Sequence, residues 1–143
     1  MEYESLLGEL GATLGFELKL SEQGTCGVLL DEDRINFEIN DGRLFIIADL
    51  ASSEGRDKDS VQLLKAANLG LQTGFACIGI DEASGQFTLC RVLEGNLTFI
   101  DFEKILTLFV RAVRYWKKWL ALPPSQTASV EEMQQFDPNE IRA

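Results

Sequence analysis

The sequence predicts an α+β domain built on an antiparallel sheet, in the order helix, three strands, helix, two strands, helix. Three observations support this fold class. Apolar residues recur at helical spacing in three segments, apolar and polar residues alternate between those segments, and short turns join the alternating stretches. The 143 residues suffice for one domain, expected at 1–122, followed by an acidic, flexible tail at 123–143.

The first helix is expected at about residues 2–14, and Gly15 offers its C-terminal stop. Gly8 and Gly11 lie inside it, each costing on the order of 1 kcal/mol relative to Ala. The helix is therefore expected to depend on packing. Its apolar positions follow helical spacing: Tyr3, Leu6, Leu7, Leu10 and Leu14.

Two turns predict a three-stranded meander with one buried face. The NDGR segment at 40–43 is a two-residue hairpin signal in which Asp-Gly suits a type I′ turn. A second tight turn, expected at residues 32–33, pairs Leu30 with Ile35. Both turns place the same residues on one face: Cys26, Val28, Leu30, Ile35, Phe37, Ile39, Leu44, Ile46 and Ala48.

The opposite face of this meander is polar except for Leu29, Phe45 and Ile47. In the predicted register Leu29 lies beside Asn36, with Ile47 beyond it, while Phe45 lies opposite Glu38. Large apolar side chains on such a face need a cover. The first or last helix of the protein, a second subunit or a binding partner would each supply one.

A polar loop at 51–60 leads into the second helix, which Asp57 or Asp59 is expected to cap and which runs to about Gln72. The glycine-rich region Gly70–Gly74 loosens and ends it. Its apolar stripe contains one polar residue: Val61, Leu64, Asn68 and Leu71, flanked by Leu63 and Ala67.

A second hairpin is expected to pair Phe75–Asp81 with Gln86–Leu93. Its simplest register places Cys77 opposite Cys90, which permits a redox pair, although small buried residues are the commoner role for such cysteines. The same register places Ala76, Ile78 and Ile80 beside Arg91, Leu89 and Phe87.

The last helix is the strongest of the three. Thr98 is expected to cap it, with Asp101 completing a variant capping box, and Pro123 to end it. Four cations crowd its C-terminal half, where the helix dipole favours them: Arg111, Arg114, Lys117 and Lys118. Its apolar stripe is continuous: Phe102, Ile105, Leu106, Phe109, Val110, Val113, Trp116 and Leu120.

The net charge is −10, from 13 basic and 23 acidic residues. Four acidic residues and Arg142 give the 123–143 tail −3, which leaves −7 for the rest. Such a field disfavours nucleic acid and anionic membrane surfaces as partners. It favours basic or polar partner segments, or serves solubility alone.

Several features predict a soluble cytoplasmic protein. The three cysteines, Cys26, Cys77 and Cys90, are odd in number and lack CxxC spacing, which suits a reducing compartment. The opening MEYESLLGEL has no basic n-region, so no signal peptide is expected. The apolar runs are too short for a transmembrane helix, and no membrane insertion is expected.

The sequence offers little for catalysis. It has no histidine, the commonest general base and metal ligand, and it has no P-loop, dinucleotide-binding glycine motif or GxSxG elbow. Asp31, Glu32 and Asp33 cluster like metal ligands, but a solvated turn followed by Arg34 explains them better. We therefore expect neither an enzyme nor a bound cofactor or metal.

Four patterns in this order resemble the class I type III secretion chaperones, the Tir chaperone (CesT-like) family. They are the helical LLGELGATLG, the strand pair CGVLLDEDRINFEIN, the helix-to-hairpin run LLKAANLGLQTGFACIGIDEASG and the closing amphipathic helix. The resemblance covers about residues 3–121 and also includes small size and acidity.

This resemblance implies a non-enzymatic function. In the family a cytoplasmic bacterial homodimer binds the N-terminal chaperone-binding segment of a virulence effector. The segment wraps around the dimer in extended form and is passed to the ATPase of the export machinery, and the chaperone itself uses no nucleotide.

The resemblance also implies roles for particular residues. It places effector capture on the first helix and first sheet, where Leu29, Phe45 and Ile47 form the expected binding patch, with Leu6 and Leu10 at its margin. It places dimer contacts on the middle helix and second hairpin, which suggests Leu64, Asn68, Leu71, Phe75 and Cys77.

Two points stay open from the sequence. An interface hydrogen bond, an intramolecular cap or a solvent-exposed edge would each explain the polar Asn68. The same fold would also serve a regulator that sequesters a transcription factor or a component of the export gate, and the sequence does not separate that role from effector chaperoning.

Overall fold

The computed structural model describes residues 2–123, and it confirms the predicted fold class and element order. All but the first residue of the expected 123–143 tail lie outside the described residues. The elements are α1 (Tyr3–Leu14), β1 (Thr25–Leu30), β2 (Asp33–Asn40), β3 (Arg43–Ser52), α2 (Asp57–Ala67), the 3₁₀ turn η1 (Asn68–Gly70), β4 (Cys77–Asp81), β5 (Gln86–Leu93) and α3 (Phe99–Leu120).

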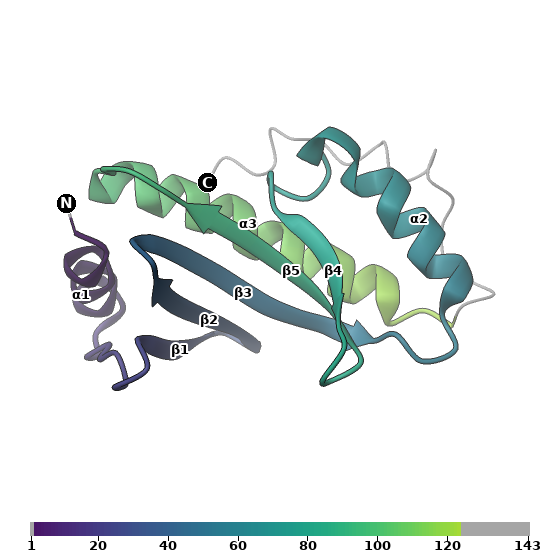
Figure 1. Ribbon diagram of the computed structural model, residues 1–143, viewed down its shortest axis with the longest axis horizontal. Coiled ribbons are helices and arrows are strands. Elements are labelled where there is room, and N and C mark those ends of the chain that lie inside the picture. The colour runs from purple at the N-terminus through teal and green to yellow at the C-terminus, as the bar shows by residue number, and fades with distance from the viewer. Residues whose placement is uncertain (1, 124–143) are drawn as a thin grey trace.

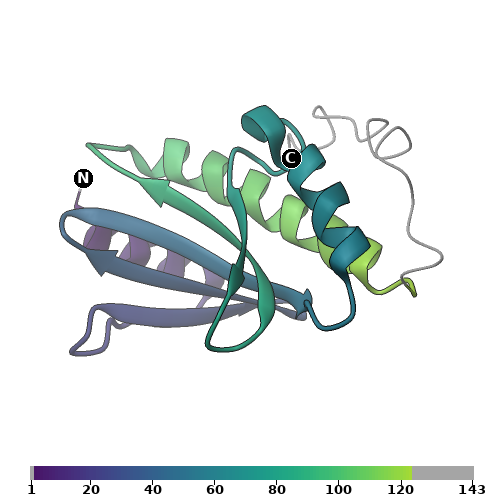
Figure 2. The same ribbon diagram turned by 45° about the vertical axis from the view of Figure 1, so that its right-hand side comes forward.

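The strands form a single antiparallel sheet in the order β1-β2-β3-β5-β4. Figure 1 shows α3 running along one face of the sheet, with α1 at the β2–β3 end and α2 beside β4. The turned view in Figure 2 places α1 and α3 on the same side of the sheet. We call the sheet face turned away from these two helices the open face.

The predicted β2–β3 hairpin is confirmed. Ile39 lies opposite Leu44 and Phe37 opposite Ile46. Asp41 and Gly42 have φ values of 51° and 73°, and the type I′ turn requires positive φ at both of its central positions. Because the side chains alternate between faces, this turn sets which β3 residues are buried.

The predicted β1–β2 register is wrong by two residues. Leu30 pairs with Asp33, and Leu29 pairs with Arg34, so the turn residues are Asp31 and Glu32. Asp31 adopts a φ of 60°, which Asp tolerates better than most residues. A shift of two preserves the side-chain period, so the set of inward-facing residues is unchanged.

The core lies between the sheet and α3. Most inward-facing residues of the sheet and of the predicted α3 stripe are buried, and each fully buried side chain contributes about 1.5–3 kcal/mol. Cys26, Leu30, Ile39 and Ile105 are only partly buried. Gly11 of α1 lies so close to the next segment that an added Cβ would stand 2.6 Å from the Phe16 carbonyl oxygen. The largest fully buried residues include Trp116, Phe37, Phe87, Phe102, Phe109, Leu6, Leu7, Leu44 and Ile46.

The ends of α2 differ from the expectation. Arg56 occupies the N-cap and neither acidic residue caps the helix with its side chain; instead the buried Asp59 accepts a 2.7 Å hydrogen bond from the Arg56 guanidinium. Arg56 also donates to the Leu122 carbonyl oxygen, which joins α2 to the end of α3. The helix stops at Ala67 rather than at Gln72.

By contrast, the cap of α3 follows the prediction. The Thr98 hydroxyl oxygen accepts from the Asp101 backbone N–H at 3.1 Å, and the same hydroxyl donates to the Asp101 carboxylate at 2.9 Å. The start of the helix that covers the sheet is therefore set by a local motif.

Asp33 is a buried ionic anchor rather than part of a solvated turn. Arg114 Nε and Lys117 Nζ of α3 donate to its two carboxylate oxygens at 2.9 and 3.0 Å. Arg114 also reaches Asp31 and the Leu30 carbonyl oxygen. Burial raises the pKa of Asp33, but the hydrogen bonds and charges of Arg114 and Lys117 outweigh it and leave that pKa lowered.

Replacing this anchor tests its contribution. Asp33→Asn is expected to lower the free energy of unfolding by about 1–2 kcal/mol, because two half-exposed cations lose their shared partner. Since the folded-state pKa is lowered, the contribution is present above about pH 4, the unfolded pKa, and is lost as the pH falls through the folded pKa. Urea unfolding across this pH range measures both effects.

Asp31→Asn is the matched control, because its carboxylate is exposed and pairs with Arg114 alone. An equal loss of stability in the two variants would contradict the anchor role of Asp33.

Candidate functional site

The open face is apolar at its centre, and no helix of residues 2–123 lies over that centre. Leu29 is 63% exposed, while Phe45 and Ile47 are half-buried among neighbouring strands. The alternate residues of β3, Leu44 and Ile46, are fully buried on the opposite side, where α1 and α3 pack. The possibility that the first or last helix covers these three residues is therefore wrong.

Two cross-strand rows define the apolar centre of the open face. Phe45 lies between Glu38 of β2 and Val92 of β5, and Ile47 lies between Asn36 and Cys90. Directly opposite side chains are within contact distance on one face of a sheet. We call the group Phe45, Ile47, Cys90 and Val92 the central patch. The sequence pattern singled out only Phe45 and Ile47, since the β3–β5 pairing is not local.

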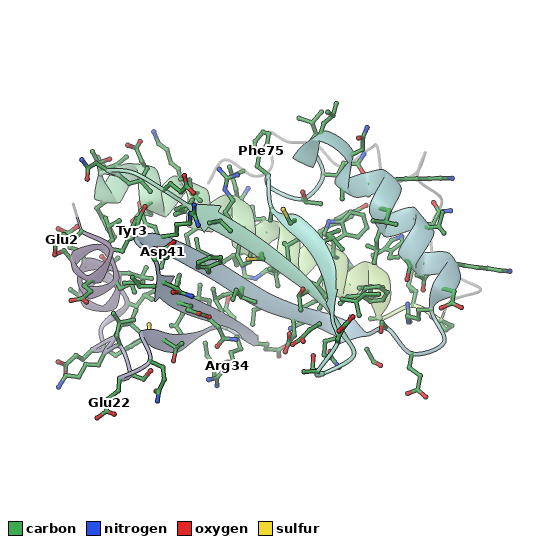
Figure 3. All side chains as sticks on the ribbon, in the orientation of Figure 1. Glu2, Tyr3, Glu22, Arg34, Asp41 and Phe75 are labelled. Atoms are coloured by element: carbon green, nitrogen blue, oxygen red, sulfur yellow. The ribbon has the colours of Figure 1, made fainter. Side chains whose placement is uncertain are left out.

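Leu29 stands apart from the central patch. The corrected register places it beside Arg34 on the outer strand β1. The Arg34 Nε donates to Asn36 Oδ1 at 3.1 Å, and a Cβ added to Gly27 would lie 3.0 Å from the Arg34 guanidinium. The Arg34 side chain, marked in Figure 3, thus lies across the glycine and makes a polar boundary between Leu29 and Ile47.

Leu6 and Leu10, expected at the margin of the binding surface, are core residues. Leu6 is fully buried and Leu10 is 5% exposed, both in the cluster beneath α1. Neither side chain is available to a partner in this conformation, so a direct contact would require α1 to move. Their expected role remains a prediction, and the surface proposed below does not use them.

The residues expected at the dimer interface are all exposed. Leu64, Leu71 and Phe75 are 67%, 56% and 52% exposed, and Asn68 and Cys77 are exposed too. Leu64 lies on α2, Asn68 on η1 and Cys77 on β4, whereas Leu71 and Phe75 lie in the connection between η1 and β4. Val61 and Leu69, which the sequence analysis did not assign to the interface, are also exposed apolar residues of this region. We define the end surface as Val61, Leu64, Asn68, Leu69, Leu71, Phe75 and Cys77.

Hydrogen bonds and close packing against α3 fix the backbone segment that carries part of the end surface. The fully buried Thr73 donates from its hydroxyl to the Ala76 carbonyl oxygen at 2.7 Å, and Trp116 of α3 donates to the Gln72 carbonyl oxygen at 2.8 Å. Gly74 packs against α3, because an added Cβ would lie 2.9 Å from the Leu108 carbonyl oxygen. The segment after α2 is thereby fixed while its apolar side chains face outward.

Two apolar residues of the end surface have strained backbones. Leu69 and Phe75 have φ values of 64° and 61°, in the left-handed region that non-glycine residues rarely adopt. Leu69 is also 78% exposed, so no packing in the single chain offsets its strain. Both side chains are exposed, and both residues follow the end of α2, where Asn68 leaves the helical region with a ψ of 125°.

Phe75 is supported on one side by Arg91. The guanidinium carbon lies 5.9 Å from the centre of the Phe75 ring, and one terminal nitrogen donates to the Phe75 carbonyl oxygen at 2.8 Å. Figure 3 shows Phe75 beyond the start of β4, beside η1. A hollow of about 440 Å³ opens here, lined by Ala67, Leu69, Gly70, Phe75, Ala76, Cys77, Ile78 and Arg91.

The predicted opposition of Cys77 and Cys90 is confirmed, and both thiols are free. Burial raises the pKa of Cys90, with further increases from Cys77 and Glu38. The Cys90 thiol is therefore neutral near neutral pH, which suits an apolar surface better than a nucleophile.

Among residues 2–123, no group of three His, Cys, Asp or Glu residues is placed to hold a metal ion. In the same part of the chain no helix has the length and apolar character needed to cross a bilayer. The central patch and the end surface are the candidate functional surfaces in the part of the chain that the structure describes.

Comparison with known families decides the assignment. The model of the Tir chaperone protein (CesT) family matches residues 5–117. The chain belongs to the CesT family. This confirms the resemblance inferred from the ordered sequence patterns. A search of curated proteins found no match for this CesT-family chain.

Solved structures share the fold of this CesT-family chain. One protein in the crystal structure of the ExsC–ExsE complex is 24% identical, with a TM-score of 0.69 over 82% of this chain and 92% of that one. One protein in the structure of the HopA1–SchA chaperone–effector complex is 21% identical, with a TM-score of 0.68. The match covers 81% of this chain and 93% of that one. The Yersinia pestis type III secretion chaperone SycH, solved with a stable fragment of YscM2, is 22% identical, with a TM-score of 0.61. The match covers 80% of this chain and 98% of that one.

The strain in this CesT-family chain is testable with two leucines of the end surface. Leu69→Gly is expected to raise the free energy of unfolding by about 0.5–1 kcal/mol, because glycine adopts positive φ without a steric penalty. Leu71→Gly is the matched control, since Leu71 is also exposed but has a φ of −68°. There glycine is expected to destabilise by a similar amount.

Chemical unfolding of the two variants, at one protein concentration, measures the difference. Equal destabilisation by both would show that the backbone at Leu69 carries no strain.

Proposed function

We propose that this chain is a type III secretion chaperone. As a homodimer in the bacterial cytoplasm it binds the N-terminal chaperone-binding segment of one or more effectors. It keeps that segment extended, soluble and competent for secretion, hydrolyses no nucleotide, and passes its client to the secretion ATPase.

The observation that carries this proposal is the uncovered central patch on the open face. An apolar group in the middle of a sheet face needs a cover, and α1 and α3 lie on the other side. Membership of a chaperone family supports a polypeptide as that cover. So does the description of the HopA1–SchA structure as a chaperone–effector complex.

The open face suits an extended segment. Apolar side chains at alternate positions of the client would contact Phe45 and Ile47, and the flanking Glu38 would favour a basic or polar neighbour. Within residues 2–123 the outer strand β1 has one edge without a partner strand, so main-chain pairing can extend the sheet beside Leu29. A client bound in this way retains few contacts of its own, which suits later release.

The end surface is the proposed dimer interface. Its apolar side chains are more than half exposed in the single chain, and two of them stand on strained backbone. Burial against a second copy would offset that strain, and an interface hydrogen bond would satisfy Asn68. Cys77 of this surface lies opposite Cys90 of the central patch, so the proposed interface and client site adjoin.

Co-purification of the full chain from its native cytoplasm, followed by mass spectrometry, tests the proposal. An N-terminal fragment of a secreted protein is the expected result. Recovery of a transcription factor or an export-gate component instead would assign the same fold to a regulator, and turnover of a metabolite would refute the chaperone function.

Substitutions that introduce a carboxylate test whether the central patch and the β1 edge bind the client. Phe45→Asp is expected to weaken client binding by roughly tenfold or more, because a carboxylate replaces an apolar contact worth about 1.5–3 kcal/mol and adjoins Glu38. Leu29→Asp, at a mostly exposed position, gives a second test with little cost to folding.

Ile100→Asp is the control, since Ile100 is 64% exposed on α3, away from both surfaces. Calorimetric titration with the recovered client fragment measures affinity, and circular dichroism verifies folding. Normal affinity in well-folded Phe45→Asp and Leu29→Asp proteins would refute the proposed client surface.

The end surface is tested at Leu64. Because Leu64 is 67% exposed in the single chain, Leu64→Asp is expected to leave the protomer folded within about 0.5 kcal/mol. In a dimer it would bury a charge, so dissociation of the dimer is expected to increase roughly tenfold or more. Sedimentation equilibrium of this variant, of Ile100→Asp and of the unchanged chain measures the effect; a Leu64→Asp dimer as tight as the unchanged one would contradict the assignment.

A further inference from the structure

Two of the three cysteines face each other across the last two strands of the chain. Cys77 of β4 lies directly opposite Cys90 of β5, so both side chains project from the same face of the sheet. Directly opposite Cα atoms of antiparallel strands lie about 4.5–5.5 Å apart, and disulfides join Cα atoms about 4.4–6.8 Å apart. The backbone of this hairpin therefore holds the two cysteines at a separation that a disulfide can span.

The two thiols are also close enough to interact electrostatically. Burial raises the pKa of Cys90, and the neighbouring Cys77 raises it further. Charge effects of this kind act between groups a few ångströms apart. The strand pairing and the electrostatic interaction therefore agree in bringing these two sulfur atoms together.

The two thiols differ in their exposure to solvent. Cys77 is exposed, whereas Cys90 is half-buried in the central patch. Gly79, the next residue of β4 on the same face, has no side chain, and a Cβ added there would lie 3.7 Å from Thr88 Oγ1, an ordinary contact. A small molecule can therefore approach Cys77 from the open face. The role of a small buried residue, which is the commoner one for such cysteines, does not describe Cys77.

Cys26 differs from this pair and provides an internal control. Phe37 of β2 stands opposite it, and the register places both on the inward face of the sheet. The Cys26 thiol is half-buried, and burial raises its pKa. Cys26 therefore has neither a facing thiol nor the exposure of Cys77.

We propose that Cys77 and Cys90 form a reversible disulfide by exchange with a small-molecule disulfide of the glutathione type. The Cys77 thiolate attacks one sulfur of the small molecule, which forms a mixed disulfide and releases one thiolate. The Cys90 thiolate then attacks Cys77 Sγ and releases the second thiolate. The two cysteines lose two electrons and two protons, and the small molecule is reduced to two thiols.

The surroundings of Cys90 suit the second step rather than the first. Its attack on a mixed disulfide at the opposite strand position is intramolecular, so a small thiolate fraction is sufficient. In a reducing compartment the pair rests as two thiols, the state in this structure. Oxidation links a residue of the end surface to a residue of the central patch. The hairpin thus carries a modification site where the two surfaces adjoin.

Thiol counting on the full chain tests the pair. After equilibration with glutathione disulfide, the denatured chain is expected to present one reactive thiol instead of three and to have lost the mass of two hydrogen atoms. Dithiothreitol is expected to restore all three thiols. Glu82 is exposed in the turn between β4 and β5, so a glutamate-specific protease separates the two cysteines. The disulfide would hold the two resulting peptides together until it is reduced.

Three serine variants assign the linkage. Cys26→Ser is expected to form the same disulfide, whereas Cys77→Ser and Cys90→Ser are expected to lose it. Because the proposed dimer covers Cys77, the reaction is also run on Leu64→Asp. Formation of the disulfide in that variant alone would support the pair and a covered end surface in the unchanged chain.

Three results would overturn the proposal, and none of them depends on client binding. They are retention of all three thiols in both the unchanged chain and Leu64→Asp, a stable mixed disulfide on Cys77 beside a free Cys90, and a disulfide between two chains on a non-reducing gel.

Discussion

The packing of α3 against one face of the sheet is the contact on which the rest of the structure depends. The stripe around Phe102, Phe109 and Trp116 fills the space above the inward side chains of the central strands. One amphipathic helix can cover only one face of a five-stranded sheet. Because α3 packs on one face of the sheet, it buries the apolar side chains there and leaves those on the other face exposed.

The same helix organises the edges of the molecule. Through Arg114 and Lys117 it holds the β1–β2 turn at Asp33. Through Trp116 it holds the segment after α2, from which the apolar side chains of the end surface project. The β1–β2 turn and the segment after α2 are therefore both positioned against one element, α3.

Much of the fold could be predicted because its signals are local. The Asp-Gly turn defined the β2–β3 register, and Thr98 defined the start of α3. The β1–β2 register could not be predicted in the same way, because two cations some eighty residues away bind Asp33. The end of α2 was also missed: the helix stops at Ala67, where Asn68 takes a ψ of 125°, and the local sequence pattern continues past that point.

By itself the sequence determined the fold class and the inward-facing set of residues, because period and turn chemistry are local properties. Its ordered patterns also carried the resemblance to the CesT family, which the family model confirms. Only the tertiary structure decided how the candidate site is composed. It put Leu6 in the core, separated Leu29 from Ile47 by Arg34, and brought Cys90 and Val92 beside β3. Which side chains share a surface depends on non-local strand pairing and on the face that a distant helix covers, and neither is encoded within a single segment.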